Sequence, residues 1–279
     1  MLNLRKWLTA ITSLLLIVIF PTQGNAGFFS PDNNRTSLII SGTPLVTEIV
    51  KILAESFKKT HPNVDIFVEN SKNEIAYSIM KRGNIDIALT SVILSKEQDT
   101  LLIRGTLFAR GSLVVVVNEQ NKIENITNKQ AHDIYVGKIK NWRELGGPFK
   151  PIKLILPRDG TVELDIIKQV LNTNSETPAE MTIFKNGAKP RLDQLASDDA
   201  YITIVRRKEF NSIKIGRALK IDGFEAKDQA ILSQLYPLYI GYYMAVLANQ
   251  NQLAKEFVDF TLSEEGQKII TEQGQISVQ

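Results

Sequence analysis

Short apolar segments alternate with amphipathic segments along most of the chain, and this alternation constrains the fold more than any other feature. Residues 37–40 form an apolar strand, and residues 64–69 and 85–89 form two more. Between them, residues 49–57 and 74–81 place apolar side chains at helical spacing, with charged side chains on the other face. Such strand–helix–strand alternation predicts layered α/β structure with parallel strands rather than a barrel of hairpins.

The second half of the chain continues this pattern. Further apolar segments predict strands at residues 113–117, 153–156, 201–205 and within 236–247. Further amphipathic segments predict helices at residues 127–135, 164–171, 253–262 and 264–273. Thr127 and Gln130 have the spacing of a capping box, which favours a helix that begins at this point.

The first 26 residues have the pattern of an export signal. Arg5 and Lys6 give a short positive start, and residues 7–20 are apolar apart from two threonines and one serine. Gly24 and Ala26 place small residues three positions and one position before a cleavage site. A membrane anchor needs about 20 apolar residues, which is longer than this run. We therefore predict a cleaved signal peptide, and the lack of a cysteine at the junction excludes a lipid-anchored lipoprotein.

Composition excludes several kinds of site. The chain has no cysteine, which excludes thiol catalysis, disulfides and cysteine-ligated metal centres. His61 and His132 lie far apart, so we expect no histidine-built metal site, and we also expect no cofactor. Without residues 1–26 the chain has 31 basic and 30 acidic side chains, and we interpret the basic triplet of residues 206–208 as a solvated loop. We therefore expect no nucleic-acid partner, because that would need a clustered basic face.

Five segments carry a resemblance to a known family. Residues 125–148 read NITNKQAHDIYVGKIKNWRELGGP, and the tail has LAKEFVDF at 253–260 and SEEGQKII at 263–270. Residues 220–223 (KIDG) and 236–238 (YPL) stand between them in order. Together these segments resemble the periplasmic phosphate-binding protein of bacterial phosphate ABC transporters, over about residues 37–275 of this chain.

The resemblance implies an architecture and a role. It implies a two-lobed type II periplasmic-binding-protein fold of the α/β class, with a ligand cleft between the lobes. Lobe one would comprise about residues 36–113 plus 225–279, and lobe two about residues 114–224. The implied ligand is phosphate or another small oxyanion, the implied partner an ABC permease, and the implied location the periplasm. We also expect a monomer.

In that family, loops at helix N-termini hold the anion, since free N–H groups and the helix dipole favour negative charge. Carried over loop by loop, the corresponding positions here are Thr43, Ser71, Thr90, Ser91, Arg158, Gly160 and Thr161. Hydroxyl groups can donate hydrogen bonds, and Arg158 can make a charge-assisted bidentate contact. The residue pattern alone also allows simpler roles. Serine and threonine at helix starts are N-caps first, and Arg158 could instead pair with Asp159 or Glu163.

Three departures from the family pattern bear on the site. Residues 70–74 contain no glycine where the family has a glycine-rich turn, and Ser91 stands where the family often has an aspartate that accepts a proton from the ligand. Glu163 lies near the position of a phosphate-binding threonine. A carboxylate about 5 Å from a dianion would cost roughly 6–7 kcal/mol at an effective dielectric of about 20. Glu163 therefore either turns away from the cleft or changes how the anion is bound.

Three classes of function follow. We favour an exported solute-binding component that delivers phosphate or a related oxyanion to an ABC permease. The alternative is a non-transport periplasmic binding or interaction module on the same fold, with an eroded phosphate site. The sequence argues against the third class, an enzyme, because it shows no nucleophile–base pair, metal cluster or nucleotide-binding glycine loop. We therefore predict no catalytic residues.

Overall fold

A computed structural model of the protein describes residues 37–91, 103–249 and 252–279. The predicted signal peptide, residues 1–26, lies outside these ranges, and so does residue 36 at the predicted start of lobe one. Among the helices of the described ranges, none has both the length and the apolar character that a membrane crossing requires.

The strands of the described residues form one main sheet, in the order β2-β1-β3-β11-β4-β8-β6-β7. In its first part, β1 (Ser37–Gly42) lies between β2 (Asp65–Asn70) and β3 (Ile87–Thr90) and runs parallel to both. β11 (Tyr239–Leu247) joins β3 on the other side and runs antiparallel to it. The carboxyl ends of β1, β2 and β3 therefore lie together at one edge of the sheet.

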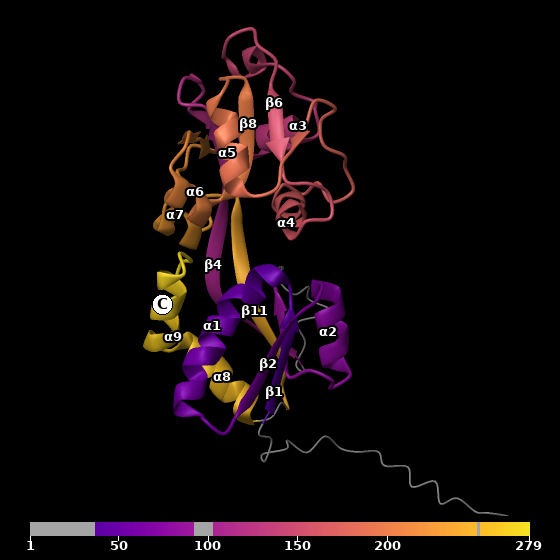
Figure 1. The fold of residues 1–279 in the computed structure, drawn as a ribbon, viewed down its shortest axis with the longest axis vertical. Helices are drawn as coiled ribbons and strands as arrows, with labels where there is room; N and C mark the ends of the chain where they lie inside the picture. The colour runs from indigo at the N-terminus through magenta and orange to yellow at the C-terminus, as the bar shows by residue number, and fades with distance from the viewer. Residues whose placement is uncertain (1–36, 92–102, 250–251) are drawn as a thin grey trace, which may run out of the picture. The chain divides into compact units, whose positions relative to one another are not determined.

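β4 (Ile103–Val117) takes part in both halves of the sheet. Residues 103–112 pair with β11, whereas residues 113–117 pair with β8 (Tyr201–Arg206). Figure 1 shows β4 and β11 as the long strands that connect the two halves. The second half is completed by β6 (Lys153–Leu156), β7 (Ile183–Phe184) and β9 (Arg217–Ala218), and a separate small sheet pairs β5 (Asn125–Ile126) with β10 (Lys220–Ile221).

The helix α1 (Pro44–Thr60) follows directly from β1. Proline is tolerated as its first residue, because the first N–H groups of a helix have no partner within it. Leu45, Ile49 and Leu53 recur at intervals of four and are buried against the first half of the sheet. This apolar stripe fixes α1 on the sheet, so that the start of the helix lies at the carboxyl end of β1.

The other helices are α2 (Asn73–Lys81), α3 (Asn128–Tyr135), α4 (Val162–Val170), α5 (Ala188–Ala196), α6 (Arg207–Ile213), α7 (Asp228–Leu232), α8 (Gln252–Leu262), α9 (Glu264–Glu272) and a 3₁₀ helix (Trp142–Leu145). The predicted capping box is confirmed, because Thr127 Oγ1 accepts from the Gln130 N–H and the Gln130 side chain accepts from the Thr127 N–H. Ser263 caps α9 through a single bond, in which its Oγ accepts from the Gly266 N–H at 3.2 Å.

The sheet differs from the sequence prediction in two respects. It is mixed rather than parallel, because β11 runs antiparallel to both β3 and β4, and β4 runs antiparallel to β8. β4 also begins ten residues before the apolar segment that predicted it. Residues 103–112 alternate less regularly and carry Arg104 and Arg110, and only their pairing with a strand from the far end of the chain makes them extended.

The interpretation of residues 206–208 as a solvated loop is wrong. Arg206 ends β8, and Arg207 and Lys208 begin α6. Arg206 and Lys208 both pair with Glu48 of α1, at 3.3 and 2.9 Å, and Arg207 pairs with Asp228 at 2.5 Å. Burial by itself would raise the pKa of Glu48, but the two cations outweigh it and hold that pKa below its usual value. These acids lie far away in sequence, so the local basic pattern could not indicate them.

Candidate functional site

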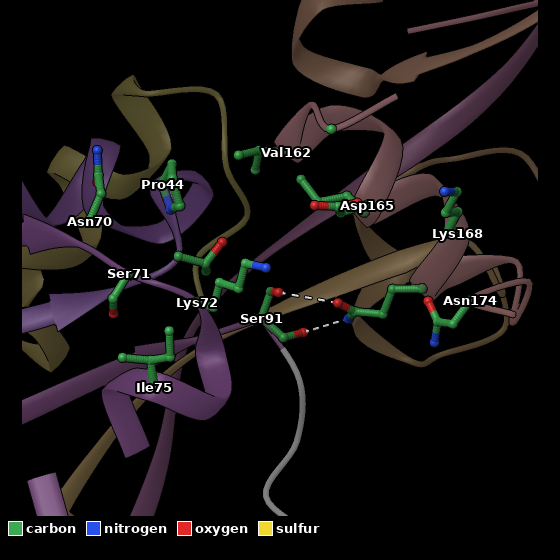
Figure 2. Close-up of a pocket in the computed structure, with 14 residues that line it drawn as sticks. Pro44, Asn70, Ser71, Lys72, Ile75, Ser91, Val162, Asp165, Lys168 and Asn174 are labelled. Atoms are coloured by element: carbon green, nitrogen blue, oxygen red, sulfur yellow. Dashed lines mark hydrogen bonds between the residues drawn. The ribbon is translucent and has the colours of Figure 1, made fainter. Parts of the chain in front are cut away.

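A cavity of about 1090 Å³ lies where both halves of the sheet contribute helix starts. Thr43 and Pro44 at the start of α1, Ser71 and Lys72 at the start of α2, and Gly160 and Val162 at the start of α4 all line it. Figure 2 shows the side chains of α1 and α2 facing those of α4 across this space. The cavity therefore collects the starts of three helices, where the first backbone N–H groups have no partner within the helix.

The start of α1 supplies a buried hydroxyl and few backbone donors. Thr43 is 8% exposed, has an extended backbone and makes no side-chain capping bond. Its carbonyl accepts from the N–H groups of Val46 and Thr47. Pro44 has no N–H to donate, so Leu45 has the first backbone donor of this helix.

Close packing of two strands brings Thr43 near the end of β3. A side chain on Gly42 would meet the carbonyl oxygen of Leu89 at 2.1 Å, so only glycine allows β1 and β3 to approach this closely. Thr43 and Ser91 follow these two strands, and both line the cavity. A glycine is thus required beside the site, although not in the loop where the family pattern has its glycines.

The loop before α2 is fixed by one backbone and one side-chain hydrogen bond instead of by glycines of its own. Ser71 donates its N–H to the Gly42 carbonyl at 2.7 Å, and Ser41 Oγ donates to Ser71 Oγ at 2.9 Å. The backbone of Lys72 is extended with φ −76°, a value that any residue adopts. This loop can therefore begin a helix at the cavity without the missing glycines.

Ser91 contacts the opposite wall of the cavity. It is 6% exposed, and its Oγ donates to Gln169 Oε1 of α4 at 3.4 Å. Gln169 Nε2 donates back to the Ser91 carbonyl at 3.1 Å, and Figure 2 shows this pair of bonds as dashed lines. The neighbouring Thr90 is buried in β3.

The first turn of α4 is capped by the side chain of Thr161. Thr161 Oγ1 accepts from the Leu164 N–H at 3.3 Å and donates to the Arg158 carbonyl at 2.7 Å. Gly160 has φ +75°, which favours glycine, and it lines the cavity with open space around it. The hydroxyl of Thr161 is thus committed to the helix cap in this structure.

Arg158 is exposed, and its N–H is bonded to Asn186 Oδ1 at 3.1 Å. Neither of the two acids considered as its partners pairs with it: Asp159 pairs with Lys168 at 3.2 Å, and Glu163 pairs with Arg191. Within the described ranges, the residues that line the cavity include Thr43, Ser71, Ser91 and Gly160 but not Thr90, Arg158 or Thr161.

Glu163 turns away from the cavity. Both terminal nitrogens of Arg191 in α5 donate to its carboxylate, one of them at 3.0 Å. Arg191 is completely buried, so this pair joins α4 to α5 beneath the surface. Of the two possibilities for Glu163, the structure has the one in which it does not repel an anion in the cleft.

Several residues that line the cavity were not predicted. Val162, Asp165, Ile166 and Gln169 occupy one face of α4 at helical spacing, and Lys72 follows the predicted Ser71 directly. The helical spacing of residues 162, 165, 166 and 169, directly after Gly160, is the sequence signal that could have predicted the α4 residues. In the described part of the chain, no group of three or more acidic or histidine side chains is placed to hold a metal ion.

Comparisons with known proteins agree with this geometry. The PBP superfamily domain matches residues 30–265 of the chain. The phosphate-binding protein PstS of Bacillus subtilis (strain 168) is 27% identical over 275 residues, which cover 94% of this chain and 90% of that protein.

Solved structures are similar as well. An ABC-type phosphate transport receptor from Vibrio cholerae has a TM-score of 0.78 and 24% identity, covering 86% of this chain and 99% of its own. A phosphate ABC transporter substrate-binding protein from Clostridium perfringens, with bound phosphate, has a TM-score of 0.67 and 26% identity, covering 87% of this chain and 100% of its own. The resemblance to periplasmic phosphate-binding proteins is thereby confirmed.

Proposed function

Because the chain belongs to the PBP superfamily and has the two-lobed fold of periplasmic binding proteins, we propose that it binds phosphate or a related small oxyanion for an ABC transporter. The observation that carries the proposal is the convergence of the starts of α1, α2 and α4 on one cavity. Free N–H groups and the positive ends of three helix dipoles favour an anion there. The names of the relatives, which are phosphate-binding proteins and phosphate receptors, point to the same ligand.

We propose Thr43, Ser71, Ser91 and Gly160 as ligand contacts, because all four line the cavity. Thr90, Arg158 and Thr161 are proposed as well, from the family resemblance. Arg158 and Thr161 belong to the same β6–α4 loop as Gly160. A modest movement of the α4 side toward α1 and α2 would bring that loop closer to an anion held there.

We also propose that the lobes divide near residue 113. Lobe one would comprise residues 36–113 plus 225–279, and lobe two residues 114–224. Support comes from β4, whose partner changes from β11 to β8 between residues 112 and 113. The cavity would then lie between the lobes, since α1 and α2 belong to the first and α4 to the second.

The relatives are transport receptors rather than enzymes, and we propose a role without catalysis for this chain as well. We further propose that it acts in the periplasm as a monomer beside an ABC permease. Cleavage after Ala26 would release a chain that begins at Gly27. Intact-mass spectrometry of periplasmic material is expected to give the mass of residues 27–279, and the full-length mass in a membrane fraction would contradict this.

Inorganic phosphate should raise the melting temperature of the purified protein. A ligand that binds only the folded state stabilises it by about 2.7 kcal/mol when its concentration is about 100 times Kd. For a chain of this size that corresponds to a rise of roughly 5–10 °C. An unchanged melting temperature at millimolar phosphate would favour the non-transport module with an eroded site, which the Ser91–Gln169 hydrogen bonds and the N–H missing at Pro44 would then explain.

Replacing Arg158 with alanine is expected to weaken phosphate binding by about 1.5–3 kcal/mol, the usual value of a hydrogen bond to a charged group. Because Arg158 is exposed and has no ion-pair partner within the described ranges, the melting temperature without ligand should stay the same. Calorimetric titration measures the affinity, with Arg143→Ala as an exposed control. Equal affinities for the two variants would remove Arg158 from the site.

A further inference from the structure

We propose that Lys72 binds the oxyanion directly, as the cation of the α2 wall of the cavity. This inference rests on the proposed function and adds to it a ligand contact that the family resemblance does not supply. Lys72 occupies a loop where the resembling family has a glycine-rich turn. Glycines let backbone N–H groups come close to the anion, and here the charge of the lysine side chain would attract the anion instead.

The position of Lys72 is fixed by the loop that carries it. Ser71 is anchored through its N–H to Gly42 and through its hydroxyl to Ser41, and Lys72 then forms the N-cap of α2 with an extended backbone. Its side chain is exposed and lines the cavity. Figure 2 shows the side chain extending from the start of α2 toward the α4 side.

The charge of Lys72 is available to a ligand. Lys168, the other lysine that lines the cavity, pairs with Asp159 at 3.2 Å. Lys72 has no ion-pair partner among the side chains that the structure describes, which do not include those of residues 73 and 74. An anion at the starts of the helices would thus find an ammonium group that does not have to break an existing pair.

Asp165 faces Lys72 from the opposite wall and is the competing explanation. It lines the cavity, is exposed and has no ion-pair partner in the described ranges. If Lys72 served to pair with Asp165 across the cavity, both residues would favour closure and neither would contact the ligand. If Lys72 binds the anion, Asp165 instead repels the same anion. The two roles therefore predict opposite effects for the loss of Asp165.

A point charge on a flexible side chain selects by charge more than by shape. We therefore expect phosphate affinity to fall with rising ionic strength, because exposed charges are screened when the Debye length shortens from about 30 Å at 0.01 M to about 10 Å at 0.1 M. In a variant without the Lys72 charge, this dependence should be weaker.

The test is calorimetric titration of inorganic phosphate into the wild type, Lys72→Gln and Asp165→Asn, at about 0.01 M and about 0.1 M ionic strength. We expect Lys72→Gln to bind about tenfold to a hundredfold more weakly, with a smaller salt effect. Asp165→Asn should bind as tightly as the wild type or more tightly. Both side chains are exposed, so melting temperatures without ligand should match and folding defects would be detected.

The remaining outcomes separate this inference from the proposed function. Unchanged affinity in Lys72→Gln, with normal binding by the wild type, would overturn the inference and leave phosphate binding intact. Equal weakening in Lys72→Gln and Asp165→Asn would also overturn it, in favour of an ion pair across the cavity. If the wild type itself binds no phosphate, the proposed function fails and the inference fails with it.

Discussion

Replacing Glu163 with alanine is expected to lower the free energy of unfolding by about 3–5 kcal/mol, because it leaves a buried guanidinium group without its counter-charge. Arg191 is completely buried and bonds to Glu163 through both terminal nitrogens. Its other acceptors are the carbonyls of Lys185 and Ile204, each at 3.4 Å, which are too distant to compensate. For a chain of this length the melting temperature should fall by roughly 10 °C.

Asp165→Ala is the matched control. Both substitutions remove an acid from the first turn of α4, so both lose a similar interaction with the helix dipole. Only Glu163 has a buried partner, and Asp165→Ala should change stability by less than about 1 kcal/mol. Equal stabilities for the two variants, together with tighter phosphate binding by Glu163→Ala, would show that Glu163 faces the ligand rather than Arg191.

Trp142→Ala should also cost about 3–5 kcal/mol of stability. Trp142 is completely buried, and its Nε1 donates to the Ala200 carbonyl at 3.2 Å. The backbone N–H of Trp142 donates to the Lys150 carbonyl and holds the 3₁₀ turn in place. The buried side chain packs this turn against the second half of the sheet. Removal would leave a cavity of indole size in the core, which surrounding side chains refill only in part.

Urea unfolding measures this effect, with Trp142→Phe as the control. Phenylalanine keeps most of the packing and loses the hydrogen bond, so we expect a much smaller change, of about 1–2 kcal/mol. Trp142 does not line the cavity in the described structure, so phosphate affinity should persist at temperatures where Trp142→Ala is folded. Near wild-type stability for Trp142→Ala would contradict the packing role.

Local patterns predicted those elements whose stability is signalled locally. The capping box of Thr127 and Gln130 marked the start of α3, and Ser263 marked the boundary between α8 and α9. Apolar side chains at helical spacing placed α1 within a few residues. In each case the groups that fix the element lie within one or two turns of one another, so the local sequence is enough to predict the element.

Long-range interactions account for most of what was missed. The first ten residues of β4 are a strand because β11, more than 100 residues later, pairs with them. α5 was not predicted, since Gly187 and Pro190 interrupt the pattern at its first turn, where proline is in fact tolerated. Glu163 pairs with Arg191, 28 residues away, and Arg206 pairs with Glu48, 158 residues away, in addition to the nearby Glu209. Only the folded chain brings the distant pairs together.

The residues of the candidate site also fall into two groups, those predicted from local sequence and those that only the fold shows. Thr43, Ser71, Ser91 and Gly160 follow strands or precede helices, and that local context, together with the family resemblance, was enough to nominate them. Lys72 was not predicted, because the family pattern has glycines rather than a charged side chain in this loop. Whether a charge faces a cavity depends on which acids neutralise it, and this cannot be known before the fold is.

Phosphate binding in the cavity at the starts of α1, α2 and α4 is the central part of the proposed function. The decisive measurement is calorimetric titration of inorganic phosphate into purified protein freed of phosphate by partial unfolding, dialysis and refolding. We expect one phosphate per chain, with a Kd in the micromolar range or below, equivalent to a binding free energy of about 8 kcal/mol or more. No measurable heat at millimolar phosphate, with the protein folded by circular dichroism, would contradict it.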